Sequence, residues 1–350
     1  MSGLGEVLAT ARRARGLTQD ELSRAAEVTQ AALSRYEHDL RTPEPEVLGR
    51  LALALGVTPS LLEHGGRMEG GIAAGAHMRR RATAKPTVWR ELEARLNMAR
   101  LHTARLMDEI SVRADRQVPS FDPVDVEPET AARLLRAQWR MPVGPVHSLS
   151  AWMDAAGVIV VEQDFGSAAR ADGLSQWSGP YPVVLVNLAA PTDRKRLTLA
   201  HELGHLVLHS SYLDDEAETQ ANRFAAELLM PEDEIRPMLR ARLTPERLVE
   251  LKRYWGVSMQ ALVERAFALR VLTPAQRGSL YKVLSARGMR RREPASEELT
   301  PEVPRLTRHI AESLRSRGLT DDEIADLAGY ASASVNALFV VPERPRLQLV

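Results

Sequence analysis

Apolar residues recur at helical spacing through the first 64 residues of the chain and predict five short helices. The earliest members of this pattern are Leu4, Val7, Leu8 and Ala11. Gly16 is a typical helix stop, and Thr18 followed by Glu21 has the form of a capping box at the next helix. Thr29 can cap a third helix, and Pro45 opens a fourth that is expected over residues 46–55. The front of the chain is therefore expected to be a compact helical bundle.

The pattern changes several times after residue 64 and mixes helices with short strands. Five glycines among residues 65–77 indicate a linker, and a long amphipathic helix is expected over residues 88–108. Runs rich in β-branched residues at 158–161 and 181–187 predict two strands. Further helices are expected over residues 130–139, 197–209, 216–229, 243–288 and 305–338. The fold class that follows is mainly α with a small β-sheet (α+β).

Breaks in this pattern divide the chain into four expected parts. Residues 1–65 form the front domain, and residues 66–128 form a basic linker with an amphipathic helix. Residues 129–290 form the domain that mixes helices and strands. A charged, proline-containing connector then leads into residues 291–350, which we expect to be a helical accessory region.

The chain contains no cysteine, which narrows the chemistry that it can carry. Disulfides, a thiol nucleophile and cysteine-bound zinc are excluded, so a metal site must use His, Asp or Glu. The sequence has no apolar run of about 18 residues, and its first residues have no signal-peptide core. We therefore expect a cytoplasmic protein with no membrane partner.

Charge is balanced over the whole chain but not along it. The formal net charge is 0, whereas residues 67–105 carry nine Arg or Lys against three acids, a local excess of +6. Such a segment can follow the phosphates of DNA, or it can be a solvated, flexible linker. The sequence leaves both interpretations open.

Residues 19–36 have the pattern of two helices joined by a short turn, as a helix-turn-helix requires. Gln19 opens the first of these helices, and Ala25 is small where we expect the two helices to cross. The turn falls at Glu27 and Val28. The outward positions of the second helix, which can reach base edges in a major groove, are Gln30, Ala31, Ser34 and Arg35.

Residues 6–63 resemble the lambda-repressor-like Cro/cI family, also called the XRE family, in LTQDEL, LSRYE and RLALALGV. The resemblance implies a double-stranded DNA operator as a partner and a homodimer as one arrangement of the chain. The residues that we assign to DNA contact are Gln19, Gln30, Ala31, Ser34, Arg35 and Arg41. Gln30 and Ala31 would lie nearest the base edges, while the two arginines would contact phosphates.

The front domain carries little positive charge for a DNA-binding module. Residues 1–64 hold seven Arg and nine Asp or Glu, a net charge of −2. Because phosphate neutralisation supplies much of the affinity for DNA, a dimer or the basic linker would have to assist. A helical bundle used for protein contacts is the alternative.

The motif HELGH at residues 201–205 lies within the apolar helix expected over residues 197–209. Residues four apart share a helix face, so both histidines can reach one zinc ion at about 2 Å. Glu202 lies beside that ion and can take a proton from water. A third ligand is required, and the following helix offers the carboxylate of Glu218. Asn222 shares a face with Glu218 and can hydrogen-bond a ligand.

Residues 130–290 resemble the ImmA/IrrE family of zinc metallopeptidases in PVVLVN, DRKRLTLAHELGHLVLH, ETQANRFAAELLMP and WGVSMQALVERAFALRVLT. The zinc ligands that the resemblance implies are His201, His205 and Glu218. It also implies Glu202 as the general base. Glu216 stays an alternative to Glu218, because the sequence does not fix the phase of the helix.

The strand expected at residues 183–187 and the histidine at position 209 can each be interpreted in two ways. Residues 183–187 can bind the backbone of a substrate by β-augmentation, as the family resemblance suggests, or they can be a plain core strand. His209 is either a surface histidine or a residue that supports a metal ligand.

Residues 318–339 echo residues 16–36 loosely, since both segments begin with GLT and an acidic stretch. A second DNA reader and simple helical packing are the two interpretations. The segment lacks Gln and Arg where a recognition helix presents them, so we expect helical packing in an accessory region that senses a ligand or partner.

These motifs predict a five-helix helix-turn-helix domain, a zincin-like HExxH domain and a helical C-terminal region. The expected function is a stress-related transcriptional regulator whose zinc-dependent endopeptidase domain cleaves a regulatory protein such as a repressor. One alternative is a transcription factor or antitoxin-like repressor whose zinc domain is a non-hydrolytic sensor or scaffold. Another is a protease whose front domain serves only for docking.

Overall fold

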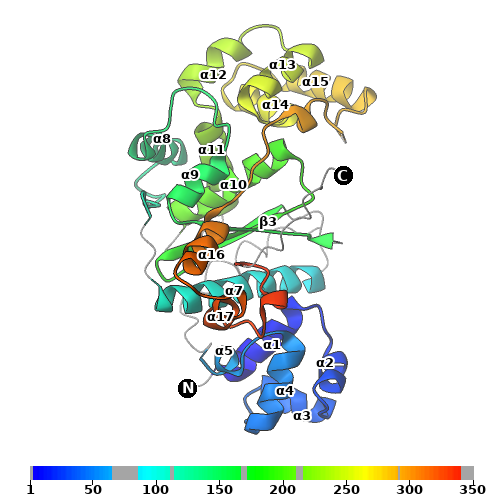
Figure 1. Cartoon of the computed structure of the whole chain (residues 1–350). Helices are drawn as coiled ribbons and strands as arrows, with labels where there is room; N and C mark the ends of the chain where they lie inside the picture. Colours follow the sequence, from blue (N-terminus) through cyan, green and yellow to red (C-terminus); the bar gives the residue numbers. More distant parts are fainter. Residues whose placement is uncertain are drawn as a thin grey trace, which may run out of the picture. The chain divides into compact units, whose positions relative to one another are not determined.

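The computed structural model describes residues 3–64, 86–110, 114–166, 172–209, 216–290 and 292–339 (Figure 1). They fall into two compact units. The first draws on residues 1–113, 176–183 and 305–350, and the second on residues 114–175 and 184–304. Helices dominate both units and the described strands form one small sheet, so the expected α+β class is confirmed.

The first unit begins with five helices that start and stop where local signals predict. They are α1 (Leu4–Ala14), α2 (Gln19–Ala25), α3 (Gln30–Glu37), α4 (Pro45–Leu55) and α5 (Pro59–His64). The capping box of Thr18 and Glu21 is present, and the Thr29 side chain caps α3. Gly56 ends α4 in the left-handed region, at φ 72°.

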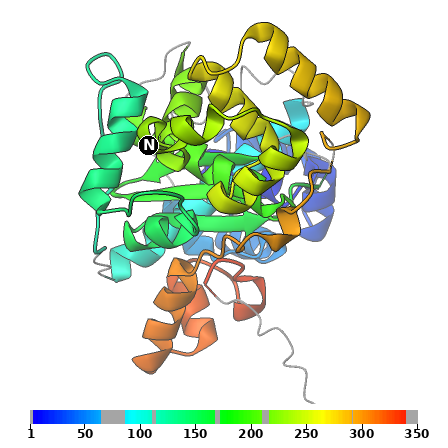
Figure 2. The same ribbon diagram turned by 90° about the horizontal axis from the view of Figure 1, so that it is seen from above.

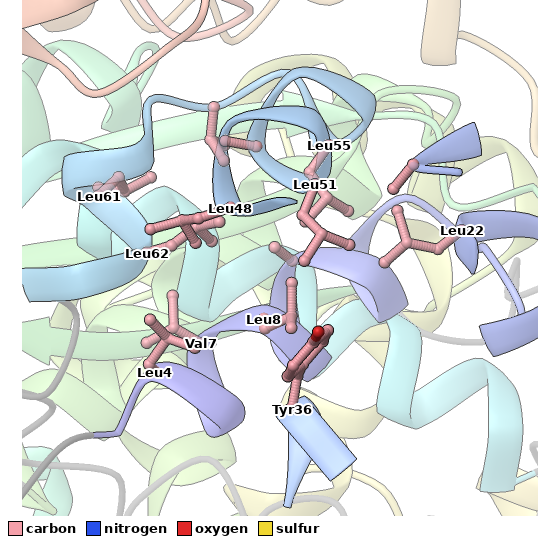
Figure 3. Packing of buried hydrophobic residues seen from close by; sticks show 14 of the residues in the cluster. Leu4, Val7, Leu8, Leu22, Tyr36, Leu48, Leu51, Leu55, Leu61 and Leu62 are labelled. Carbon is pink, nitrogen blue, oxygen red and sulfur yellow. The ribbon is translucent and has the colours of Figure 1, made fainter. Parts of the chain in front are cut away.

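Apolar side chains from all five helices meet in one core (Figure 3). The members with no exposed surface are Val7, Leu8, Leu22, Ala26, Leu33, Leu51 and Leu62. Burying a leucine fully stabilises the fold by about 1.5–3 kcal/mol, so a handful of such residues can hold a domain of this size together.

The closest helix crossing in this bundle differs from the expected one. Ala25 is exposed, and its neighbour Ala26 lies in the core instead. The tight approach is between α1 and α3, where a Cβ on Gly5 would lie 2.6 Å from the carbonyl oxygen of Tyr36. Because the phase of a seven-residue helix is hard to fix from two adjacent alanines, the sequence misplaced the contact.

The remaining described helices of the first unit are α7 (Pro86–Glu109), α16 (Leu306–Ser316) and α17 (Asp321–Leu327), followed by the 3-10 turn η3 (Ala333–Val335). α7 matches the long helix expected over residues 88–108. Of the basic segment at residues 67–105, residues 67–85 lie outside the described residues. The proposed phosphate-tracking role of that segment therefore stays a prediction.

The sheet has the strand order β1-β3-β2, with β1 at Ile159–Gln163, β2 at Gly173–Ser178 and β3 at Tyr181–Asn187. A two-residue turn at Gly179 and Pro180 joins β2 to β3 as an antiparallel hairpin. β1 runs parallel to β3, since Leu188 donates a backbone hydrogen bond to Gln163 where both strands end. β3 therefore has a hydrogen-bonded strand on each side, and the hypothesis that residues 183–187 bind a substrate strand is wrong.

The second unit contains the helices α8 (Pro128–Trp139), α9 (Leu149–Ala155), α10 (Thr192–Leu208), α11 (Ala217–Leu229), α12 (Glu232–Leu239), α13 (Pro245–Trp255), α14 (Met259–Ala268) and α15 (Pro274–Ala286). The short turn η2 (Ser296–Glu298) lies in the connector after α15. α10 and α11 pack side by side (Figures 1 and 2). None of the helices in the described part of the chain is both long and apolar enough to cross a membrane.

α10 begins five residues before the start expected from its apolar pattern, because its first turns are charged but buried. Asp193 binds Lys252, Lys195 pairs with Glu162, and the Arg196 guanidinium lies 2.5 Å from Glu302. Three partners far away in sequence therefore hold the beginning of the helix that carries HELGH. Such ion pairs leave no periodic signal in the sequence.

Candidate metal centre and DNA-reading face

Three potential ligand atoms converge between α10 and α11. The Nε2 atoms of His201 and His205 lie 3.0 Å apart, and the Glu218 carboxylate lies 3.6 Å and 3.5 Å from them. Ligands of a tetrahedral ion with bonds of about 2 Å are separated by roughly 3.3 Å, so this donor set fits a divalent cation. Both imidazoles are buried, whereas a quarter of the Glu218 side chain is exposed.

The geometry distinguishes the two carboxylates that the sequence left open. Glu216 is exposed at the N-cap of α11 and lies outside the His/Glu cluster found among the described residues. Glu218 lies in the first turn of α11 and faces α10. The sequence alternative based on Glu216 is therefore not supported by this geometry.

Both histidines of the cluster are held from behind by hydrogen bonds. The Nδ1 atom of His201 lies 3.0 Å from Oδ1 of Asn222, the residue expected from the sequence to support a ligand. The Nδ1 atom of His205 lies 3.0 Å from Nδ1 of His209. His209 is 2% exposed, so the interpretation as a surface histidine is wrong. Oε1 of Gln220 accepts a hydrogen bond from Nε2, the other nitrogen of the His209 ring.

Glu202 is buried beside this cluster and is held by the edge of the sheet. The hydroxyl of Ser175, on β2, donates a 2.7 Å hydrogen bond to Oε2 of Glu202. A Cβ on Gly173, at the start of the same strand, would lie 2.6 Å from the Thr198 side chain and 3.1 Å from Cγ of Glu202. A residue without a side chain is therefore needed for β2 to lie this close to α10. The sequence pattern did not indicate β2, so it missed both Ser175 and Gly173.

A cavity of about 1310 Å³ opens in the second unit next to the cluster. Its lining includes Thr198 of α10 and Thr219 and Asn222 of α11. Residues of α14, of α15 and of the connector at 290–298 complete the wall. Asn222 both lines the cavity and contacts His201, so the cavity lies one residue away from the candidate metal centre. Its volume exceeds that of most small-molecule sites and is adequate for a peptide segment.

The outward face of α3 carries the side chains that were expected to meet DNA. Gln30, Ala31 and Arg35 are exposed, Ser34 is half-buried, and Arg41 is exposed in the loop that follows. Gln30 donates a 2.7 Å hydrogen bond to the half-buried Gln19. Four of the six residues expected to contact DNA therefore lie on α3, Gln19 contacts them through Gln30, and Arg41 follows in the next loop. Their contact with DNA stays a prediction.

A buried carboxylate that the sequence did not single out fixes this arrangement. Glu37 receives two hydrogen bonds from Arg12, at 2.5 Å and 2.9 Å, and one of 2.8 Å from Gln19. The chain of contacts Arg12–Glu37–Gln19–Gln30 joins the core side of α1 to the exposed face of α3. Gln30 is thus oriented before any base is present.

Two family models match the chain. Residues 8–62 match the helix-turn-helix model, and residues 153–267 match the model described as the IrrE N-terminal-like domain. The chain is also similar to the radiation response metalloprotease IrrE of Deinococcus radiodurans, at 34% identity over 173 residues. That alignment covers 45% of this chain and 49% of the relative, so the chain matches about half the length of that protein. The chain therefore carries an XRE-type helix-turn-helix domain at its front and an IrrE-like metallopeptidase domain behind it.

Proposed function

We propose that this protein is a DNA-binding transcriptional regulator whose second domain is a zinc-dependent endopeptidase that cleaves a regulatory protein such as a repressor. The observation that carries the proposal is the convergence of His201, His205 and Glu218 beside a buried glutamate. Two imidazoles and one carboxylate form a donor set typical of catalytic zinc, with a position left for water or substrate. The similarity to a protein named a radiation response metalloprotease supports hydrolysis and a stress-related role.

Each side chain of the site has a specific task in this proposal. A bound zinc ion would supply Lewis acidity, which polarises a peptide carbonyl and makes water more acidic. Glu202 accepts the proton of the attacking water and passes it to the leaving amine. Ser175 holds one carboxylate oxygen of Glu202 and so directs the other toward the water. The exposed quarter of Glu218 marks the side from which a substrate approaches.

The substrate is a peptide segment in an extended or locally unfolded state. Among the described strands, β2 is hydrogen-bonded to β3 alone, and a peptide backbone would pair with its outer edge at Gly173 to Ser175, where the strand residues are buried. Ser175 connects that edge to Glu202, which brings a paired backbone to the reacting group. The neighbouring cavity has room for the side chains that follow the scissile bond.

The front domain recognises a specific DNA sequence. Gln30 and Ala31 meet base edges, Gln19 and Ser34 support the contact, and Arg35 and the exposed Arg41 bind phosphates. The net charge of −2 over residues 1–64 makes a lone domain a weak binder. A homodimer, or help from the basic residues after position 66, raises the affinity to a useful level.

The Glu202→Gln variant tests the peptidase part of the proposal. The amide keeps the size and the hydrogen bond to Ser175, so the variant is expected to bind zinc and DNA as the wild type does. Cleavage of a degenerate, internally quenched peptide library is expected to fall by at least about 100-fold, since general-base catalysis typically contributes this much. No cleavage by the zinc-loaded wild type would favour a sensor or scaffold without hydrolysis. Equal cleavage by both proteins would show that Glu202 is not the general base.

Substitution of Gln30 and Arg35 by alanine tests the DNA part separately. Sequence-selective binding, measured against genomic fragments at fixed salt, is expected to disappear while zinc content and cleavage stay unchanged. Unaltered DNA selectivity in that variant would point to a front domain used only for docking.

A further inference from the structure

Two buried polar residues near the candidate metal centre, His209 and Gln220, have no role as ligands in the proposed site. His209 follows α10 and is 2% exposed, while Gln220 lies on α11. They form a line with His205, with contacts of 2.7 Å from Gln220 to His209 and 3.0 Å from His209 to His205. Buried polar groups of this kind are kept only when hydrogen-bonded, so the direction of each bond can be worked out.

The position of each proton in this row of hydrogen bonds follows from Gln220, the residue farthest from the candidate metal centre. The Oε1 atom of Gln220 carries no proton, so Nε2 of His209 must donate to it. A neutral His209 then keeps a lone pair on Nδ1, and the proton between the two rings belongs to Nδ1 of His205. The remaining nitrogen of His205, Nε2, is left unprotonated and faces His201 and Glu218.

We propose that Gln220 and His209 are positioning residues that lock His205 in the tautomer able to bind a cation. Asn222 does the same for His201 in a single step, because its Oδ1 accepts from Nδ1 of that ring. Both relays start on α11, the helix that also carries Glu218, so the docking of one helix prepares all three ligands. This inference rests on the proposed metal centre and adds the residues that prepare it.

Gln220→Met and Gln220→Glu form a matched pair for the test. Methionine removes the acceptor at similar size, whereas glutamate keeps an oxygen that accepts from Nε2 of His209. Zinc affinity, measured at mildly alkaline pH against a chromophoric chelator, is expected to fall by about 10–100-fold in the methionine variant. The glutamate variant is expected to bind zinc like the wild type. Equal affinity in all three proteins would overturn the inference.

Nitrogen-15 spectra of the histidine rings in the metal-free wild-type chain give an independent readout that needs no variant. His205 is expected to carry its proton on Nδ1, and a proton on Nε2 would contradict the relay even if the variants failed to fold. If the wild type shows the expected tautomer but binds no zinc, the metal centre is wrong while the relay stands. The two failures are therefore distinguishable.

A second inference comes from an internal repeat in the first unit. α16 begins and ends 302 residues after α1 (306 − 4 and 316 − 14), and α17 lies 302 residues after α2 (321 − 19 and 327 − 25). Gly16 and Gly318 both have positive φ after the first helix of each copy. Capping boxes then open the next helix of each copy, made by Thr18 with Glu21 and by Thr320 with Glu323.

The two copies differ at the third element. The eight residues of α3 correspond to the short turn η3, and the positions of Gln30 and Arg35 are taken by Ser332 and Ala337. Residues 306–339 hold three Arg and five Asp or Glu, a net charge of −2. The second copy therefore has no recognition helix.

What the second copy has instead is a contact with the second half of the helix-turn-helix domain and with α7. Thr58 donates a backbone hydrogen bond to Gly329, and Ala331 donates one to Gly56, so the turn between α4 and α5 pairs with the repeat. His102 of α7 donates from Nδ1 to the carbonyl of Ala328, at 2.7 Å. Its ring stacks on Tyr330 at 3.6 Å.

Gly329 shows how tightly this contact is built. It adopts φ +80°, and an added Cβ would lie 2.8 Å from Cδ1 of Leu61 and 2.9 Å from Cδ of Arg105. The equivalent residue in the first copy is Glu27, which also has positive φ but is exposed. We infer that residues 306–339 are a second copy of the first half of the helix-turn-helix domain that has exchanged DNA reading for docking on that domain and on α7.

Gly329→Ala and Gly318→Ala test this docking as a matched pair. Both glycines have positive φ, but nothing lies within 4 Å of a Cβ on Gly318. In hydrogen exchange of the full chain, Gly329→Ala is expected to speed exchange of the Thr58 amide by about tenfold or more. Gly318→Ala is expected to leave that amide unchanged. Docking would be refuted if both substitutions changed the exchange rate of the Thr58 amide equally, or if neither substitution changed it.

The loss of DNA reading by the second copy has its own measurement. A chain with Gln30→Ala and Arg35→Ala keeps residues 306–339 intact and is expected to show no sequence-selective DNA binding. Selective binding that remains in this chain, and that disappears on substitution of Ser332 and Ser334, would overturn the inference.

Discussion

Replacing Gly204 by alanine is expected to weaken both the fold of the second unit and the affinity of the proposed metal centre for zinc. Gly204 lies in HELGH where α10 meets α11. An added Cβ would lie 3.0 Å from Cδ1 of Phe224 and 3.2 Å from Cα of Ala221. Carbon atoms in favourable contact lie about 3.5–4.0 Å apart, so the two helices would have to separate by a few tenths of an ångström.

The size of the effect follows from two opposing terms. Overpacking of a core contact costs about 1–3 kcal/mol, whereas alanine gains about 1 kcal/mol over glycine in a helix interior. The net expectation is a loss of about 1 kcal/mol in the free energy of unfolding, within a range of roughly 0–2 kcal/mol. Displacement of α11 also moves Glu218, so we expect weaker zinc binding.

Gly278→Ala supplies the matched control. Gly278 lies in the middle of α15, and nothing lies within 4 Å of an added Cβ. This variant feels the propensity gain alone and is expected to be stabilised by about 0.5–1 kcal/mol. Urea unfolding can be followed by fluorescence, since the fully buried Trp139 and Trp255 lie in the same unit. Equal stabilisation by the two substitutions would show that α11 can accommodate a Cβ on Gly204 without strain.

Three further outcomes are expected. Leu51→Ala removes a fully buried side chain from the front core and is expected to lower the unfolding free energy by about 2–5 kcal/mol, whereas Leu53→Ala, at a side chain 74% exposed, should stay within about 0.5 kcal/mol in the same urea titration. Glu302→Gln leaves a buried arginine without its carboxylate and is expected to cost about 3–5 kcal/mol in the second unit; a loss near zero would show that water replaces the carboxylate. Burial lowers the pKa of His102 to about 4 from its ordinary 6.5, so the folded chain stays neutral there while the unfolded chain takes up a proton. The first unit should therefore be fully stabilised above about pH 6.5 and lose up to about 3 kcal/mol as the pH falls toward 4, and an identical pH profile after His102→Asn would rule this origin out.

The sequence predicted those elements whose signals are local. α2 and α3 begin at threonine caps, and α4 begins at proline and ends at Gly56, so these bounds follow from a few residues each. β2 was missed because its sequence, GLSQWS, contains no β-branched residue and has glycine and polar residues at most positions. Its burial depends on α7 and α10, which the pattern of a six-residue segment cannot reveal.

The residues of the candidate site also separate into those that a local motif predicts and those that depend on packing between elements. HELGH is a local motif, so His201, Glu202 and His205 could be named from the sequence. The choice between Glu216 and Glu218 required the phase of α11, and Ser175 required a strand that the sequence did not predict. Gln220 is separated by 11 residues from the His209 ring that it contacts, and only the packing of α11 on α10 brings the two together.

The Arg196 guanidinium has a consequence for the order in which the protein can be made. It lies in the helix of HELGH, but its carboxylate partner Glu302 comes 106 residues later in the chain. A ribosome that has produced every proposed zinc ligand has therefore not yet produced Glu302, the residue that neutralises Arg196 near the start of α10. An uncompensated buried charge costs several kcal/mol, so α10 is expected to gain its final stability only after translation has passed Glu302. Under the proposed function, such timing would keep an unfinished chain from cleaving its substrate.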